Sequence, residues 1–154
     1  MSINKQIINL YRADIKNPGD FFSPPTRYII FNNYNTMYFD FLKLPEKKQY
    51  ECDMIIIGGG GLFGDEKWLN LFNIWLERIK YKYCIAWGVG IDKHIENNII
   101  FKKFDLIGCR SKNTIYRYVP CASCLHPIFD KYKKVTGNNE SRISHIKRII
   151  PNSI

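Results

Sequence analysis

Four glycines follow a strongly apolar segment near the middle of the chain. Gly59, Gly61 and Gly64 form a G-x-G-x-x-G pattern directly after the residues DMIII and a further glycine. Because glycine has no Cβ, this turn can approach a phosphate or carboxylate closely and present backbone N–H groups to it. The same glycines, Gly60 included, also suit a tight turn from strand to helix in which side chains would not fit. Both interpretations are compatible with the pattern.

The residues after the glycines disfavour a dinucleotide site. A dinucleotide fingerprint requires an acidic residue about 20 positions further on, where it holds the ribose. Residues 84–87 (CIAW) contain no acid, and Asp92 lies further along. The pattern also follows an internal strand rather than the first one. We therefore expect the glycine backbone to contribute to a ligand site, and we expect no cofactor.

Two more apolar segments end in residues that can bind ligands. Gly88 and Gly90 follow residues 83–87 (YCIAW), and Arg110 follows residues 104–109 (FDLIGC). A guanidinium at the carboxyl end of a strand can form paired hydrogen bonds with a phosphate or carboxylate. The alternative is a surface arginine paired with a neighbouring acid. The position of Arg110 favours the binding role.

The first apolar segment, residues 7–12, is followed by Asn17, Pro18, Gly19 and Asp20. All four residue types are common in turns. Taken alone, this segment therefore favours a simple turn over a binding role.

Residues 121–126 (CASCLH) contain two cysteines and a histidine, Cys121, Cys124 and His126. They make up half of a zinc ligand set, without a second pair at the usual spacing. A redox C-x-x-C pair would open a helix, whereas this one follows a proline. We expect no metal here, and a structural or substrate-lining loop instead.

The odd total of five cysteines, without a secretory signal, favours reduced thiols in the cytosol.

Apolar runs and helical spacing predict the elements that position these residues. Strands are predicted at residues 7–12, 53–57, 83–87 and 104–109. Helices are predicted at residues 66–80 and 111–118. Residues 26–33 are compatible with a helix or a strand, and we favour a helix. Continuous apolar strands alternating with helices indicate an α/β, Rossmann-like parallel sheet covered on both faces. We expect one domain over residues 1–122, followed by a basic segment at 123–154.

Composition and charge narrow the classes of function. The 154 residues are 45% apolar and 24% charged, which excludes wholesale disorder and a disulfide-dense mini-protein. The net charge is +9, and residues 101–154 hold 11 basic and 3 acidic side chains. This asymmetry is compatible equally with an anionic partner and with a simple solvated basic surface. Nucleic acid is the least favoured partner because most aromatic residues fall in apolar runs.

Without a membrane-spanning run or a signal sequence, we expect a cytoplasmic location, with the inner membrane face as an alternative.

The order of these motifs resembles the N-terminal half of the polysaccharide pyruvyl transferase family. Residues 17–20 (NPGD) are similar to the family's N-x-G-D motif. Residues 53–62 (DMIIIGGGGL) and 87–91 (WGVGI) are similar to its poly-glycine and G-x-G turns. Residues 106–111 resemble its strand ending in Arg-Asp, and residues 119–130 resemble a segment near its domain boundary.

This resemblance implies one half of a fold like that of GT-B glycosyltransferases. It also implies transfer of a pyruvyl group from phosphoenolpyruvate to a sugar of a surface polysaccharide. Arg110 would hold the donor, and the substrate-binding set would be Asn17, Asp20, Gly59, Gly60, Gly61, Gly88, Gly90 and Arg110.

Two departures from the family pattern stand out. Ser111 replaces the acid that follows the family arginine, and the family's second domain, with its Arg- and His-bearing motif, has no counterpart here. His126 is the best local candidate for a general acid. The alternative is a non-catalytic half that binds an anionic ligand, a second-domain partner or another copy of itself.

Overall fold

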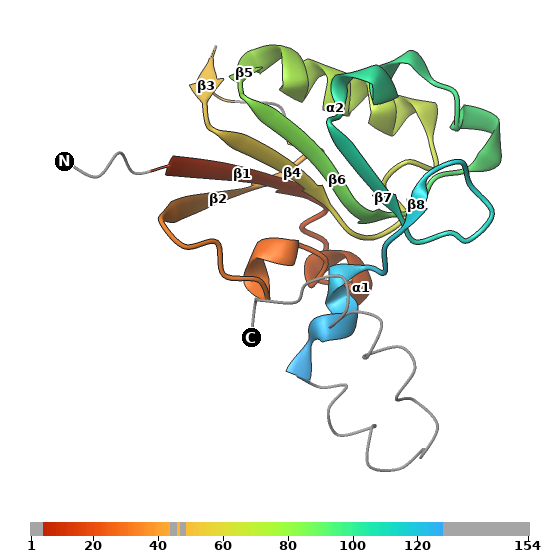
Figure 1. Cartoon of the computed structure of the whole chain (residues 1–154), viewed down its shortest axis with the longest axis horizontal. Helices are drawn as coiled ribbons and strands as arrows, with labels where there is room; N and C mark the ends of the chain where they lie inside the picture. Colours follow the sequence, from red (N-terminus) through yellow and green to blue (C-terminus); the bar gives the residue numbers. More distant parts are fainter. Residues whose placement is uncertain (1–4, 44–45, 47–48, 128–154) are drawn as a thin grey trace.

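The computed structural model describes residues 5–43, 46 and 49–127, and it contains a six-stranded parallel sheet (Figure 1). The strand order is β2-β1-β4-β6-β7-β8. The strands are β1 (Lys5–Tyr11), β2 (Tyr34–Asp40), β4 (Met54–Gly58), β6 (Tyr83–Val89), β7 (Leu106–Cys109) and β8 (Arg117–Tyr118). A separate parallel pair consists of β3 (Tyr50–Glu51) and β5 (Ile79–Lys80). The predicted α/β, Rossmann-like class is confirmed.

The core lies between the sheet and helix α2 (Glu66–Arg78). The strand register aligns Ile8 with Ile55 and Cys84, so these three side chains lie on the same face of the sheet. They belong to the same buried cluster as the apolar face of α2, formed by Leu69, Phe72, Trp75 and Leu76. The apolar runs that predicted the strands are therefore the residues that build the core.

Helix α2 begins where its sequence indicates. Asp65 is the N-cap residue, and its side chain accepts a hydrogen bond of 2.7 Å from the backbone N–H of Lys67. Arg78 lies in the last turn, where a positive charge complements the helix dipole. The helix runs back from the carboxyl end of β4 to the start of β6, which fixes where the loop after β4 lies.

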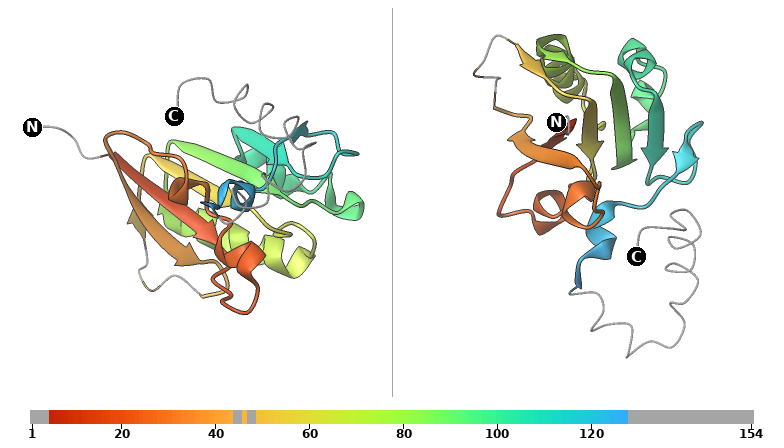
Figure 2. Two further views of the ribbon diagram at one scale, coloured as in Figure 1. Left: turned by 90° about the horizontal axis from the view of Figure 1, so that it is seen from below. Right: turned by 60° about the vertical axis from the view of Figure 1, so that its left-hand side comes forward.

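The two faces of the sheet are covered differently in the described part of the chain. Helix α2 and the 3-10 segments η2 (Lys93–Ile95) and η3 (Ile99–Lys103) lie on one face (Figure 2). On β6 and β7, by contrast, Tyr83 is 54% exposed and Leu106 is 63% exposed. The second face is covered over β1 and β4, where η1 (Pro25–Arg27) packs on Gly58 and Thr26 donates a hydrogen bond to the buried Asn9, and it is open over β6 and β7.

The helix expected at residues 26–33 is wrong. This stretch contains only the 3-10 turn η1 (Pro25–Arg27), and the next element is the edge strand β2. Pro24 and Pro25 restrict the start of the segment, and Asn33 at its end adopts a positive φ of 67°. Strand β2 was not predicted because its half-exposed sequence, YNTMYFD, lacks a continuous apolar run.

The helix expected at residues 111–118 is also wrong, because contacts from outside the segment fix it in an irregular path that ends in β8. The buried Glu96 accepts a hydrogen bond from the backbone N–H of Ile115, and its carbonyl accepts one of 2.8 Å from the hydroxyl of Tyr116. Val119 packs directly against Gly108 on β7. The basic segment expected at 123–154 lies mainly outside the described residues, which end at Pro127.

The five thiols differ in how accessible they are. Cys124 is exposed, whereas Cys52, Cys84, Cys109 and Cys121 are buried. Burial raises the pKa of Cys52 to about 11 and also raises the pKa of Cys84. We expect a maleimide at pH 7.5 to modify one thiol rapidly in the native protein and the other four only after unfolding. Mass spectrometry of the labelled chain checks this, with Cys124→Ser as the control that loses the rapid step. Two or more rapidly labelled thiols would contradict the packing around the sheet.

Candidate functional site

The carboxyl ends of the parallel strands meet at one edge of the sheet, where α1 (Pro18–Phe21) and η4 (Ala122–Leu125) also lie (Figure 1). After β1 the chain first forms β2, which pairs with one side of β1, and then forms β4, which pairs with the other side of β1. Ligands of open α/β sheets bind outside the strand ends at this kind of reversal. The loops after β1 and β4 are therefore the first place to look for a site.

The three strand-end motifs lie together at this edge. The carbonyl of Gly60 accepts a hydrogen bond of 2.7 Å from the backbone N–H of Gly90. The N–H of Arg110 donates one of 2.9 Å to the carbonyl of Val89. The prediction that the glycine turns and Arg110 converge at one edge is confirmed. We call Asp20, Gly60, Gly61, Gly90 and Arg110 the strand-end cluster.

The guanidinium of Arg110 lies over the two glycine turns. A Cβ built on Gly90 would be 3.1 Å from its Nε atom, and a Cβ built on Gly61 would be 3.5 Å from its Nη2 atom. Arg110 is exposed and makes no ion pair within the described ranges. Its paired N–H donors are therefore available to an anion at this position.

The glycine turn needs glycines for two reasons. Gly59 and Gly60 have φ angles of 62° and 77°, which side chains other than glycine rarely adopt. A Cβ on Gly60 would also lie 2.3 Å from Oδ1 of Asp20. Among the hydrogen bonds of the described residues, the N–H groups of Gly60 and Gly61 have no acceptor. The tight turn therefore requires these glycines, as the sequence suggested. The N–H groups of Gly60 and Gly61 are two backbone donors beside Arg110.

Asp20 is brought to the glycine turn by the loop after β1. The side-chain amide of Asn17 donates a hydrogen bond of 2.7 Å to Oδ2 of Asp20, which orients the carboxylate. Burial raises the pKa of Asp20 above its usual value, and the positive charge of Arg110 opposes that rise only in part. A carboxyl group with a raised pKa beside an arginine at a strand-end crossover is a candidate functional group.

Gly88 has a packing role that the sequence did not reveal. It has a φ of 62°, and a Cβ there would lie 2.5 Å from the carbonyl oxygen of Pro120 and 2.8 Å from Cα of Cys121. The loop over Gly88 leads to His126, whose ring lies 4.5 Å from that of Phe22. In the part of the chain that the structure describes, no three metal-binding side chains lie close enough to hold an ion.

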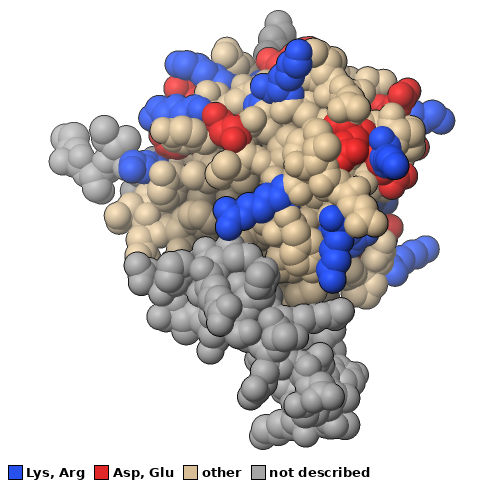
Figure 3. Space-filling view, turned by 45° about the vertical axis from the view of Figure 1, so that its right-hand side comes forward, with Lys and Arg blue, Asp and Glu red and all other residues tan. Residues whose placement is uncertain are grey.

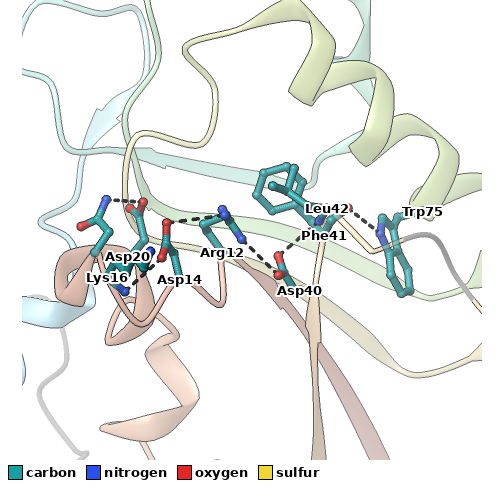
Figure 4. A network of polar contacts seen from close by, with 9 residues as sticks. Arg12, Asp14, Lys16, Asp20, Asp40, Phe41, Leu42 and Trp75 are labelled. Atoms are coloured by element: carbon teal, nitrogen blue, oxygen red, sulfur yellow. Dashed lines mark hydrogen bonds and ion pairs between the residues drawn. The ribbon is translucent and has the colours of Figure 1, made fainter.

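Arg12 is a charged residue at this edge that sequence reasoning did not single out. Its guanidinium bridges two acids, with Nη1 lying 3.1 Å from Asp40 and Nη2 lying 3.5 Å from Asp14 (Figure 4). Arg12 follows β1 directly, as Arg110 follows β7. Its position at the end of a strand was therefore the feature of the sequence that could have identified it. The bridge itself could not be foreseen without β2, which ends at Asp40.

Charge on the described residues is close to balanced. They contain 15 basic and 12 acidic side chains, a net charge of +3. On the face shown in Figure 3, Lys and Arg are scattered among Asp and Glu and do not form one continuous basic surface. This distribution offers no support for a nucleic-acid interface on that face. No described helix is long and apolar enough to cross a membrane.

Comparison with known proteins gives a family match. The family model described as Polysaccharide pyruvyl transferase matches residues 4–140. No curated protein and no solved structure matches the chain significantly. The matched range contains every residue of the strand-end cluster.

Proposed function

Because the chain belongs to the polysaccharide pyruvyl transferase family, we propose that it binds phosphoenolpyruvate at the strand-end cluster and takes part in transferring its pyruvyl group to a sugar of a surface polysaccharide. The observation that carries this proposal is Arg110 beside the N–H groups of Gly60 and Gly61, which among the described residues have neither an ion pair nor an acceptor, respectively. Phosphoenolpyruvate has a phosphate and a carboxylate, and such donors suit either group. Three other members of the predicted substrate-binding set lie outside the cluster. Asn17 and Gly59 would position Asp20 and the glycine turn, and Gly88 would make room for Pro120.

The transfer makes definite demands on the site. The methylene carbon of phosphoenolpyruvate gains a proton and becomes a methyl group, while the adjacent carbon becomes electron-poor. Two sugar hydroxyl oxygens bond to that carbon, the bond to the phosphate oxygen breaks, and inorganic phosphate leaves. The two hydroxyl protons balance the one gained by the methyl group and the one carried by the phosphate. Cationic groups stabilise the phosphate as it leaves, which is the role we assign to Arg110.

We assign Asp20 to the sugar side of the reaction, because a carboxylate is a poor partner for an anionic donor. It can accept a hydrogen bond from a sugar hydroxyl and hold that oxygen near the donor. Its raised pKa lets it also take up the hydroxyl proton more readily than an ordinary carboxylate would.

Asp20→Asn is expected to leave phosphoenolpyruvate binding intact or to strengthen it about two- to fivefold, because the substitution removes a negative charge beside the anion. Calorimetric titration of phosphoenolpyruvate into the full chain and into this variant measures the effect. Asp53→Asn is the control, because Asp53 lies at the opposite, amino edge of β4. Loss of binding in Asp20→Asn alone would contradict the assignment, since it would make Asp20 a direct partner of the donor. Absence of phosphoenolpyruvate binding to the unmodified chain would contradict the proposed function itself.

A binding module without transfer activity is the second candidate. The observation in its favour is that His126, the local candidate for the general acid, packs against aromatic rings. Its partly buried ring packs 4.5 Å from Phe22 and 6.2 Å from Tyr28, measured between ring centres. Phosphate release from phosphoenolpyruvate in the presence of a glycoside supports transfer. Saturable binding without consumption of phosphoenolpyruvate supports the binding module.

A further inference from the structure

A pocket of about 300 Å³ lies at the carboxyl ends of β1 and β2, next to the strand-end cluster but outside it. Tyr11 and Asp40, the last residues of the two strands, are paired in register and both line it. We call it the β2 pocket. Its volume is at the lower end of the range for small-molecule sites, which suits one ring rather than a long chain.

Aromatic rings form one wall of the β2 pocket. Phe39, Tyr50 and Trp75 lie with their ring centres 5.2 to 6.0 Å apart. Trp75 is 2% exposed, and its indole Nε1–H donates a hydrogen bond of 3.0 Å to the carbonyl of Phe41. This wall is fixed by packing and hydrogen bonding, so it offers a preformed apolar surface whose rings are tilted at 39° to 68° to one another.

Polar groups surround that wall. Asp40 and Glu46 contribute two carboxylates and Lys43 contributes one ammonium group. The carboxylate of Asp40 is held by Arg12 at 3.1 Å and by the backbone N–H of Leu42 at 3.3 Å (Figure 4). Because Arg12 neutralises Asp40, the remaining pair of Glu46 and Lys43 leaves the lining without net charge, so it does not attract an anion. The ligand that fits is therefore neutral, with one apolar face and several hydroxyl groups.

We propose that the β2 pocket binds one neutral sugar ring. The C–H face of a pyranose packs on an aromatic wall, and its hydroxyl groups donate hydrogen bonds to carboxylates. Arg12 joins the pocket to the strand-end cluster, because it bridges Asp40 in the pocket to Asp14 in the loop that leads to Asp20. That the bound sugar is the pyruvyl acceptor rests on the proposed function, whereas sugar binding itself does not.

The three tryptophan indole N–H signals of the ¹⁵N-labelled full chain provide the test. Methyl glucoside, methyl galactoside and methyl mannoside are titrated separately, with glycerol as a non-ring control. At least one glycoside is expected to shift the Trp75 signal saturably, with a dissociation constant of about millimolar size. Glycerol is expected to produce no saturable shift. Failure of all three glycosides to shift Trp75 overturns the proposal.

Tyr38→Ala tests whether the pocket itself is responsible. Tyr38 lines the pocket and is 41% exposed, so its removal should leave the core intact. The variant is expected to bind the glycoside about three- to tenfold more weakly. Tyr83→Ala, at an exposed tyrosine on β6, is the matched control and should bind normally. Equal affinity in the two variants overturns the proposal.

Titrating phosphoenolpyruvate into the same samples separates the two claims. Glycoside binding without phosphoenolpyruvate binding would support the β2 pocket and contradict the proposed function. Phosphoenolpyruvate binding without a glycoside shift at Trp75 would do the reverse. Phosphoenolpyruvate that competes with the glycoside for Trp75 would overturn the claim that the pocket selects a neutral ligand.

Discussion

Replacing Arg110 with lysine is expected to weaken phosphoenolpyruvate binding about ten- to hundredfold. Arg110 presents a planar fork of N–H donors over Gly61 and Gly90, and it has no acidic partner among the described residues to compete for that fork. Lysine keeps the charge, but its compact ammonium group cannot reproduce two parallel hydrogen bonds to one phosphate or carboxylate. The loss therefore reports geometry rather than net charge. Calorimetric titration of phosphoenolpyruvate into both proteins measures it.

Arg78→Lys provides the matched control. Arg78 is an exposed arginine in the last turn of α2, at the opposite edge of the sheet from the strand-end cluster. It should bind phosphoenolpyruvate like the unmodified chain. Equal weakening by the two substitutions would point to general charge attraction. Unchanged affinity in Arg110→Lys would remove Arg110 from the donor site while leaving the fold unaffected.

The convergence of Gly60, Gly90 and Arg110 could be predicted because each follows a continuous apolar run. In a parallel sheet the carboxyl ends of such strands share one edge, so the sequence order of the motifs was enough to place them together. The same reasoning could not identify the role of Gly88. Glycine is required at this position because Pro120, which is distant in the sequence, lies directly over the strand end.

The edge strand shows where pattern reasoning stops. Strand β2 is half-exposed along its length, so its sequence lacks the apolar run that marks the central strands. Without β2, Arg12 lacks Asp40, the nearer of its two acidic partners, and there is no β2 pocket, although Arg12 occupies the same strand-end position as Arg110. The contact between Asp20 and Gly60 was equally hidden, because it joins two loops forty residues apart.

Gly88→Ala is expected to destabilise the protein by about 2–5 kcal/mol. The φ of 62° at this position is costly for alanine, and a methyl group would meet the carbonyl oxygen of Pro120 at 2.5 Å and Cα of Cys121 at 2.8 Å. Both obstacles are backbone atoms, so no side-chain rotation can relieve the clash. The register of β6 and β7 also shifts between Trp87 and Val89, which leaves the strand little freedom to adjust.

Urea unfolding followed by tryptophan fluorescence measures this destabilisation, which should lower the transition midpoint by about 1 M or more. Gly64→Ala is the control, because Gly64 does not have a positive φ. A Cβ built on Gly64 would lie 3.5 Å from the nearest contacting atom, which is an ordinary distance. Its midpoint should stay close to that of the unmodified chain. A Gly88→Ala protein that accumulates only in insoluble form, beside a soluble Gly64→Ala protein, would be the extreme form of the expected result. Equal midpoints for the two variants would mean that the loop over Gly88 can move aside at little cost, and Gly88 would then be free to serve a ligand rather than the turn.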